Sequence, residues 1–297
     1  MNSTETKTWT ILSLLETSTN YLLQKKIDDA RLSVEILLSD SLKLPRIQLY
    51  SQFDKVITQS ELLTFKKKFT SLVANEPLQY IVGQTSFYGL QILCDKRALI
   101  PRPETESIVE KCIEYIKLHF PINKQLSVLE VGTGTGCISI ALAKSLSNLK
   151  IMAIDIDEYS LNLANENIKL HSLKDRIELK KVDINNLISN LELQDIDIII
   201  SNPPYISKEE YQNLPIHIHD HEPRHALTDE NDGLQFYHKL NKISQTILKQ
   251  NGLLIIEHGS EQSEKVKEIF SNEVWNYESS IIDMSKHVRG AIYKFHN

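Results

Sequence analysis

A short apolar stretch ends in Asn202-Pro203-Pro204-Tyr205, and this segment carries the clearest chemical signal in the chain. The two prolines fix two backbone φ angles and remove two amide donors, and each disfavours helix in the residue before it. The segment is therefore a rigid edge rich in hydrogen-bond acceptors. The Asn202 side-chain oxygen and a nearby backbone carbonyl could accept both hydrogens of a planar –NH2 group, on which Tyr205 could stack. The alternative is a rigid turn that binds nothing.

A glycine-rich loop, Gly132-Thr133-Gly134-Thr135-Gly136, follows another apolar stretch. Glycines let the backbone turn sharply and approach a ligand closely. The loop differs from the dinucleotide-binding pattern G-x-G-x-x-G, because position 137 is a cysteine, and the Gly-Lys-Ser/Thr of a P-loop does not follow. The loop favours a bound small molecule, and a tight turn without a ligand is the alternative.

Asp155 ends the next apolar stretch, 23 residues after Gly132. An acid about 20 residues beyond a glycine loop can accept hydrogen bonds from ribose hydroxyls, so the spacing fits a nucleoside-containing cofactor. Asp157 is a neighbouring alternative. The other role of an acid at this place would be to cap the helix that begins near Ser160.

These segments lie in a pattern where strands alternate with helices. Apolar stretches predict buried parallel strands at Ser127–Val131, Ile151–Ile154, Ile177–Val182, Ile196–Ile200 and Leu253–Glu257. Helices are expected between them, such as Tyr159–Leu170 and Leu234–Lys249, and two more strands near Tyr277–Ile282 and Ala291–Phe295. The alternation predicts a doubly wound α/β sheet, in which ligands bind beyond the carboxyl ends of the strands. The loops after the first, second and fourth strands should therefore meet at one site.

The first quarter of the chain has a helical period instead. One apolar helical face is formed by Ile27, Ala30, Val34, Leu37 and Leu38. Thr58 and Glu61 have the spacing of a capping box for a further helix, which the segment ending in Pro77 terminates. We predict a small helical domain over residues 1–76, a hairpin connector over 77–97 with its turn at Gly89, and the α/β domain over 98–297.

Composition limits the classes of function. The 297 residues include 33 Lys and Arg against 39 Asp and Glu, a net charge of −6, and the only basic run is Lys66-Lys67-Lys68. Proteins that bind a phosphate backbone usually cluster Lys and Arg, so nucleic acid is not an expected partner. The sequence shows neither a signal peptide nor the ~18 consecutive apolar residues of a membrane span, so no membrane association is expected.

Cysteines and histidines bear on metals and on the compartment. The three cysteines form no C-x-x-C pair, which argues against a disulfide framework or a zinc cluster and favours a reducing, cytoplasmic compartment. The segment His217–His221 has histidines at i, i+2 and i+4, which could share one strand face and bind zinc. Nothing else in the sequence indicates a catalytic metal. We therefore predict no metal and interpret this segment as a polar loop near the substrate.

Several segments together carry a family resemblance. They are Phe87-Tyr88-Gly89-Leu90, Ile100-Pro101-Arg102-Pro103-Glu104-Thr105-Glu106, the glycine loop, Asn202-Pro203-Pro204-Tyr205-Ile206, Glu222-Pro223, Ala226-Leu227 and Glu257-His258-Gly259. In these segments the chain resembles class I S-adenosylmethionine-dependent methyltransferases of the N-P-P-Y group, which methylate planar nitrogens. It resembles most closely the release-factor glutamine N5-methyltransferase family (PrmC/HemK). The I-P-R-P-E-T-E segment discriminates, since the sister family acting on a ribosomal protein has P-R-S-P there.

The resemblance implies a Rossmann-like methyltransferase sheet with S-adenosylmethionine as cofactor and S-adenosylhomocysteine as product. It implies methyl transfer to the side-chain amide N5 of the glutamine in the Gly-Gly-Gln loop of class I peptide chain release factors, which modulates translation termination. It also implies that the glycine loop holds the methionine end of the cofactor, Asp155 the ribose, and Asp183 with Ile184 the adenine. The family often has an aromatic residue at the position of Ile184, so this chain departs from the family there.

The resemblance also assigns roles within the N-P-P-Y segment. The sulfonium of the cofactor already activates the methyl group, so the enzyme mainly has to align an amide nitrogen with it. We expect Asn202 and the Pro203 carbonyl to accept both N–H hydrogens and to stabilise the developing positive charge, without a dedicated general base. Tyr205 is a further candidate catalytic residue. Pro204 and Tyr205 complete the substrate contact, and Asn202 also borders the cofactor.

Two other functions use the same motifs. A nucleic-acid amino-methyltransferase would have the same site, but the acidic balance of the chain disfavours it. A cofactor-binding interaction protein, whose helical domain docks a partner, is disfavoured by the intact glycine loop and N-P-P-Y segment. Arg102 lies just before a helix expected to begin at Pro103, and it could serve the helix start or the site.

Overall fold

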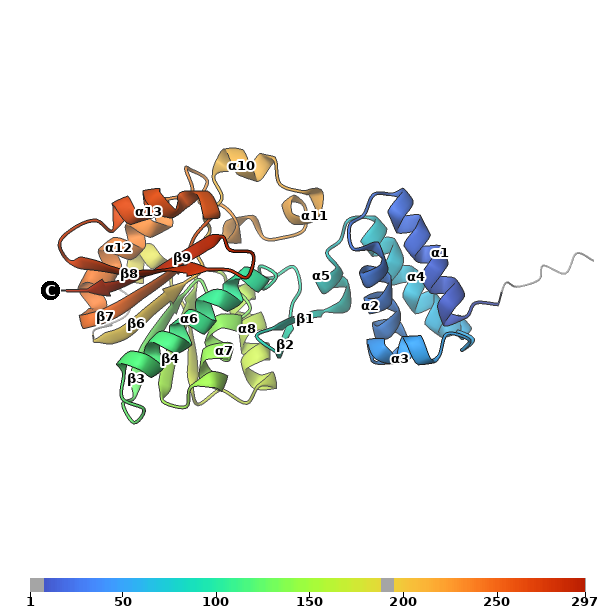
Figure 1. Cartoon of the computed structure of the whole chain (residues 1–297), viewed down its shortest axis with the longest axis horizontal. Helices are drawn as coiled ribbons and strands as arrows, with labels where there is room; N and C mark the ends of the chain where they lie inside the picture. Colours follow the sequence, from blue (N-terminus) through green and yellow to red (C-terminus); the bar gives the residue numbers. More distant parts are fainter. Residues whose placement is uncertain (1–7, 188–194, 297) are drawn as a thin grey trace, which may run out of the picture. The chain divides into compact units, whose positions relative to one another are not determined.

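The computed structural model describes residues 8–187 and 195–296. By its internal packing the chain divides into two compact units, Met1–Gly83 and Gln84–Asn297. The first unit is helical and the second contains a seven-stranded sheet (Figure 1). Among the described residues, no helix combines the length and the hydrophobicity needed to cross a membrane.

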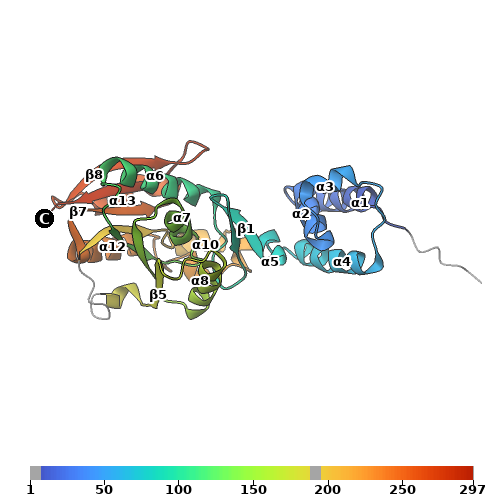
Figure 2. The same ribbon diagram turned by 90° about the horizontal axis from the view of Figure 1, so that it is seen from below.

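The helical unit has a leucine-rich core. Its helices are α1 (Ile11–Gln24), α2 (Ala30–Leu42), α3 (Arg46–Ser51), α4 (Gln59–Val73) and α5 (Leu78–Val82) (Figure 2). The predicted helical face is confirmed from Ala30 onward, because Val34, Leu37 and Leu38 of α2 are fully buried, whereas Ile27 precedes the helix. The predicted capping box is also confirmed: Thr58 Oγ1 accepts a hydrogen bond from the Glu61 amide (3.3 Å), and Glu61 Oε2 accepts one from the Thr58 amide (2.8 Å).

The helical unit continues past residue 76, where we expected it to end. Pro77 terminates one helical region but also caps α5, because its φ of −56° is compatible with a helix start. Leu78, Ile81 and Val82 then pack against the core of the helical unit. Residues 77–83 therefore belong with the helices, and the hairpin after them belongs to the sheet unit. The role of the hairpin as a connector stays a prediction.

The hairpin itself is confirmed. Strands β1 (Gln84–Phe87) and β2 (Leu90–Leu93) pair antiparallel, with Phe87 opposite Leu90. Tyr88 and Gly89 form the turn, and both have a positive φ, which glycine adopts without steric cost. Phe87 is buried in the core of the sheet unit, so the hairpin is anchored there.

The main sheet has the strand order β5-β4-β3-β6-β7-β9-β8. Its strands are β3 (Leu126–Val131), β4 (Leu149–Asp155), β5 (Ile177–Lys181), β6 (Ile196–Ser201), β7 (Leu248–Glu257), β8 (Trp275–Ile282) and β9 (Val288–Phe295). The first five strands in this order, β5, β4, β3, β6 and β7, are parallel to one another. Strand β9 pairs antiparallel with both β7 and β8. The predicted α/β class and the predicted strands are confirmed.

Helices cover both faces of this sheet. They are α6 (Pro103–His119), α7 (Cys137–Ser145), α8 (Glu158–Leu170), α10 (Lys208–Gln212), α11 (Ile216–His219), α12 (Gln235–Ile247) and α13 (Ser263–Ile269), with the 3-10 turns η1 (Ile184–Asn186), η2 (Arg224–Ala226) and η3 (Ser260–Gln262). Helices α6, α7 and α8 pack on one face, and α12 and α13 on the other (Figure 1). Helix α12 ends before the predicted Lys249, because Leu248 already pairs with Ile196 in the sheet.

The strand order positions the site. From β3 the chain proceeds to β4 and β5 on one side, and then returns to β6 and β7 on the other. Such a reversal opens a crevice beyond the carboxyl ends of the central strands. The loops after β3, β4 and β6, which carry the predicted chemistry, converge at this crevice.

Candidate active site

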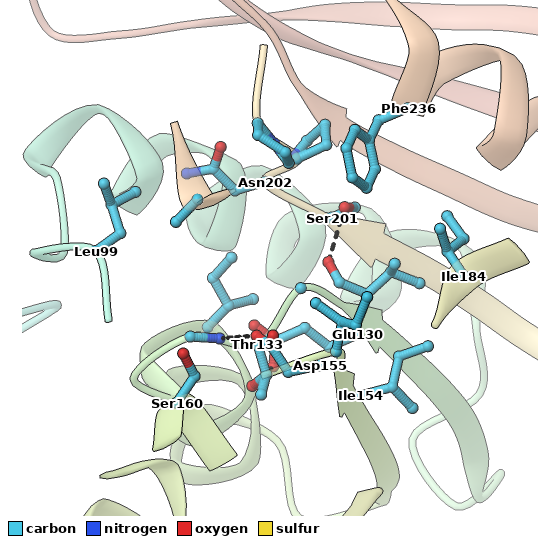
Figure 3. A pocket seen from close by; sticks show the side chains of 18 of the residues that line it. Leu99, Glu130, Thr133, Ile154, Asp155, Ser160, Ile184, Ser201, Asn202 and Phe236 are labelled. Carbon is cyan, nitrogen blue, oxygen red and sulfur yellow. Dashed lines mark hydrogen bonds between the residues drawn. The ribbon is translucent and has the colours of Figure 1, made fainter. Parts of the chain in front are cut away.

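A pocket lies at this crevice and is formed mainly by the loops that the sequence singled out. Of the predicted site residues, those that line it are Gly132, Thr133, Gly134, Thr135, Asp155, Asp183, Ile184, Asn202, Pro203 and Pro204. In the view of Figure 3, Asn202 and Phe236 lie on one side of the pocket, and Thr133 and Asp155 on the opposite side. The two predicted residues outside its lining are Gly136 and Tyr205.

The glycine loop needs glycine for two different reasons. Gly134 has a φ of +53°, and its amide donates a hydrogen bond to Asp155 Oδ2 (2.9 Å). Gly136 caps α7 with a φ of +81°, and a Cβ there would lie 3.4 Å from the Ala164 Cβ. The loop thus turns tightly enough to expose its backbone to the pocket, while Gly136 supports helix packing beneath it.

Asp155 and Asp157 have separate roles. Asp155 ends β4, and its two carboxyl oxygens accept hydrogen bonds from the amides of Gly134 (2.9 Å) and Asp157 (3.0 Å). Burial raises the pKa of Asp155, and these amides partly offset the rise. Asp157 instead caps α8 by accepting a hydrogen bond from the Ser160 amide (2.8 Å). Asp155 is therefore the acid that faces the pocket, and ribose binding by it stays a prediction.

The far end of the pocket is apolar. Asp183 Oδ1 accepts a hydrogen bond from the Asn185 amide (2.8 Å), which presents Ile184 to the pocket after β5. Phe236 of α12 lines the same pocket, and Figure 3 shows both Phe236 and Ile184. No sequence pattern indicated Phe236, because its position in a helix gave no signal that the ring reaches the site. An aromatic ring is thus present here, although it comes from a different element than the family pattern implies.

Glu130, another residue that no sequence pattern indicated, also lines the pocket. It is 1% exposed at the end of β3, and Thr133 Oγ1 donates a hydrogen bond to its Oε2 (2.9 Å). The Ser139 hydroxyl donates to the same oxygen. Burial raises the pKa of Glu130 to about 7, and within the described residues its Oε1 has no hydrogen-bond partner. A buried acceptor of this kind is complementary to an N–H donor or a cationic group.

Asn202 follows β6 and has a fixed orientation. The Ser201 hydroxyl donates to the Val131 carbonyl (2.8 Å) and ties the ends of β6 and β3 together. Asn202 Nδ2 donates to Thr105 Oγ1 (3.2 Å). Because the amide nitrogen faces Thr105, Oδ1 is the atom that can accept a hydrogen bond from a ligand. Thr105 belongs to the I-P-R-P-E-T-E segment, whose contact with Asn202 the sequence did not reveal.

Tyr205 lies in an adjoining cavity that Asn202 and Pro203 also line. Burial is the main cause that raises the pKa of Tyr205, and the nearby Glu257 carboxyl adds to the rise. The phenol therefore stays protonated at neutral pH. The N-P-P-Y segment forms the wall that the two cavities share.

An ion pair between a half-buried arginine and a buried glutamate joins two further segments at this wall. Arg102 donates a hydrogen bond from Nη2 to Glu222 Oε1 (2.6 Å), and the Ile100 amide donates to Glu222 Oε2 (3.3 Å). Arg102 is also the residue that caps α6, with Pro103 in the first turn, as predicted. Arg102 lines both cavities, so it serves the helix start and borders the site.

The histidine segment does not have the geometry required by the zinc alternative. Ile216–His219 forms the short helix α11, so the histidines at i, i+2 and i+4 do not share a strand face. Over residues 8–187 and 195–296, no cluster of three or more His, Cys, Asp or Glu residues could hold a metal ion.

Two family models match the chain. A methyltransferase domain matches residues 122–294, and a PrmC N-terminal domain matches residues 13–83. The release factor glutamine methyltransferase of Rhodopirellula baltica is 38% identical over 250 residues, which cover 84% of this chain and 83% of that protein. The release factor glutamine methyltransferase of Chlorobaculum tepidum is 33% identical over 270 residues, which cover 90% and 92%. In fold, a methyltransferase structure from Pyrococcus furiosus matches with a TM-score of 0.50 and 19% identity, over 71% of this chain and 90% of that one.

The sheet, the glycine-loop pocket and the matched domain define a class I S-adenosylmethionine-dependent methyltransferase. Within this class, the chain belongs to the release factor glutamine methyltransferase family. The resemblance noted from the sequence is therefore confirmed, as is the enzyme class with its cofactor.

Proposed function

We propose that this enzyme transfers the methyl group of S-adenosylmethionine to the side-chain amide N5 of the glutamine in the Gly-Gly-Gln loop of class I peptide chain release factors. The observation that carries the proposal is the orientation of Asn202, whose Oδ1 is the acceptor available beside the glycine-loop pocket. The names of the curated relatives support the same substrate class. We expect the reaction to occur in the cytoplasm, which suits three buried free thiols.

The pocket residues fit the parts of the cofactor. Glu130 Oε1, a buried acceptor without a partner in the described residues, suits the ammonium group of the methionine end. Asp155 suits the ribose hydroxyls, since its carboxyl oxygens have lone pairs beyond those used by two amides. Ile184 and Phe236 suit the adenine as apolar walls. The bound cofactor supplies a methyl group that its sulfonium has already activated.

The N-P-P-Y segment handles the amide of the substrate. An amide nitrogen is a weak nucleophile because its lone pair is delocalised. Asn202 Oδ1 and the Pro203 carbonyl accept its two N–H hydrogens, hold the nitrogen in place and stabilise positive charge as it develops. The side chain of the glutamine enters through the cavity that contains Tyr205, since Asn202 and Pro203 line both cavities. The protonated product loses its proton to solvent, so no general base is needed.

The experiment uses methyl-labelled S-adenosylmethionine, the purified enzyme and a class I release factor. A copy of the factor in which the Gly-Gly-Gln glutamine is replaced serves as the matched control. Total RNA, total DNA and ribosomal proteins are tested separately. Label on the intact factor alone is the expected result, and label on nucleic acid or a ribosomal protein would overturn the substrate assignment.

A further inference from the structure

Three polar side chains follow one another from Asn202 through Thr105, which also lines the pocket, to Glu257. Asn202 Nδ2 donates to Thr105 Oγ1 (3.2 Å), and the Thr105 hydroxyl lies near enough to the Glu257 carboxyl to lower the pKa of that group by hydrogen bonding. Thr105 is 2% exposed and Glu257 is 1% exposed. Glu257 does not line the pocket, so the mechanism above gives this carboxyl no direct role.

The fold brings these three residues together from distant parts of the sequence. In the parallel pair β6 and β7, Ser201 lies opposite Ile256, so the next residues, Asn202 and Glu257, lie at the same edge of the sheet. The first turn of α6 carries Thr105 to this edge. The Tyr237 hydroxyl donates to the Glu257 carbonyl (3.1 Å) and fixes the backbone that carries the carboxyl.

The number of protons available to Thr105 and Glu257 for hydrogen bonding determines how the Asn202 amide is oriented. A threonine hydroxyl has one proton, and an ionised carboxyl can only accept. When the Thr105 proton is donated to Glu257, the Thr105 oxygen can only accept a hydrogen bond from Asn202. Asn202 must then turn its NH2 group toward Thr105 and its Oδ1 toward the ligand. Without the carboxyl, Thr105 could donate to Oδ1 instead, and the amide could present its NH2 group to the pocket.

We propose that Glu257 is a positioning residue that sets the orientation of the Asn202 amide through Thr105, and thereby makes the site select a nitrogen that donates two hydrogens. The proposal rests on the proposed function, because it concerns how the same site recognises an amide. The requirement is that Asn202 turns its Oδ1 toward the substrate, and the N-P-P-Y segment alone does not fix that orientation. A flipped Asn202 would offer two donors to a substrate that also offers two donors, and would repel it.

The surroundings of Glu257 make this device sensitive to pH. Burial is the largest influence and raises the pKa of Glu257 to about 7, while the hydroxyls of Thr105 and Tyr205 oppose the rise. Glu257 also interacts electrostatically with four other titratable groups, which are Glu104, Arg289, Cys137 and Tyr237. Below this pKa the protonated carboxyl can itself donate to Thr105, which frees the Thr105 proton for Asn202 Oδ1. The turnover number should therefore fall as the pH decreases through about 7.

The first test replaces the hydroxyl. Thr105→Val keeps the shape of the side chain but cannot bond to either neighbour, so we expect kcat to fall at least about tenfold. The dissociation constant of S-adenosylmethionine, measured by calorimetry, should change less than about threefold. Thr105→Ser should restore most of the lost rate. Ser244→Ala removes another fully buried hydroxyl, on α12 and outside the pocket lining, and is the matched control.

The second test replaces the carboxyl and examines coupling. Glu257→Met should also lower kcat at least about tenfold, and the decline of kcat toward low pH should disappear. In an Asn202→Ala background, Thr105→Val should cost no further rate, because groups that act through one residue are not additive. Tm values and cofactor affinity verify that each variant is folded.

The outcomes separate this inference from the proposed function. A wild-type enzyme without activity on the release factor would contradict the proposed function itself. An active wild type, with Thr105→Val near its rate, or with losses that add fully to those of Asn202→Ala, would overturn the positioning role alone.

Discussion

The two halves of the active site are built in different ways. On the cofactor half, backbone amides supply most of the order: Gly134 and Asp157 donate to Asp155, and a sharply turned glycine loop forms the wall. On the substrate half, side chains from distant segments supply it, through the contacts of Thr105 with Asn202 and of Arg102 with Glu222. Backbone contacts depend on local sequence, whereas side-chain contacts depend on the whole fold. Mutations in the two halves should therefore change different measured quantities.

The largest effect is expected from Asn202→Ala. It removes the acceptor that holds the amide, so kcat should fall by about a hundredfold or more, while the cofactor dissociation constant changes little. Steady-state kinetics at saturating S-adenosylmethionine measure this. Asn148→Ala removes a half-buried asparagine that donates to the Lys124 carbonyl at the other end of the sheet, and is the control. Near wild-type turnover in Asn202→Ala would contradict the assigned role.

The next effect is on the cofactor half. Asp155→Ala should raise the dissociation constant of S-adenosylmethionine by about tenfold or more, because a charge-assisted hydrogen bond contributes about 1.5–3 kcal/mol. At saturating cofactor, kcat should stay within about threefold. Calorimetric titration and kinetics separate the two quantities.

Asp157→Ala is the matched control for Asp155→Ala, since it removes a neighbouring acid that caps α8. It should cost about 1 kcal/mol of stability and leave cofactor affinity unchanged. Equal losses of affinity in the two variants would indicate that Asp155 acts only through the loop structure.

A smaller effect is expected from the apolar end of the pocket. Phe236→Ala should raise the cofactor dissociation constant up to about tenfold, since an aromatic contact contributes about 0.5–1.5 kcal/mol beyond its burial. Phe120→Ala, which removes a half-buried ring outside the pocket, is the control. An unchanged affinity would mean that Phe236 does not contact the adenine.

The smallest effect should follow metal removal. Because the methyl group is already activated by the sulfonium, a chelator should leave kcat within about twofold of its value in untreated enzyme. Activity in EDTA, followed by addition of zinc, measures this. A loss that zinc restores would contradict a metal-free reaction.

The same contrast explains what the sequence could predict. The strands, the hairpin and the capping box follow from local periods and spacings, and the structure confirms them. The glycine loop and Asp155 were also predictable, because their meeting needs only two adjacent parallel strands. The sequence instead assigned residues 77–83 to the connector, because their packing on the core of the helical unit depends on tertiary contacts.

The supporting residues of the substrate half were not predictable as site residues. Thr105 and Glu257 come from a helix start and a strand end, and no short spacing links them to Asn202. Their segments in part matched family motifs, but only the fold shows which side chains meet. Ile184 indicated that the family's aromatic contact was absent at one position, and the structure supplies a ring from α12.

Mass spectrometry of the modified product tests the central claim most directly. A class I release factor is incubated with the enzyme and S-adenosylmethionine, digested, and the peptide with the Gly-Gly-Gln loop is fragmented. The account predicts one added methyl group on the side-chain amide nitrogen of that glutamine, formed by the wild type and lost in Asn202→Ala. A methyl group on another residue or atom, or an unmodified peptide with the active wild type, would contradict it.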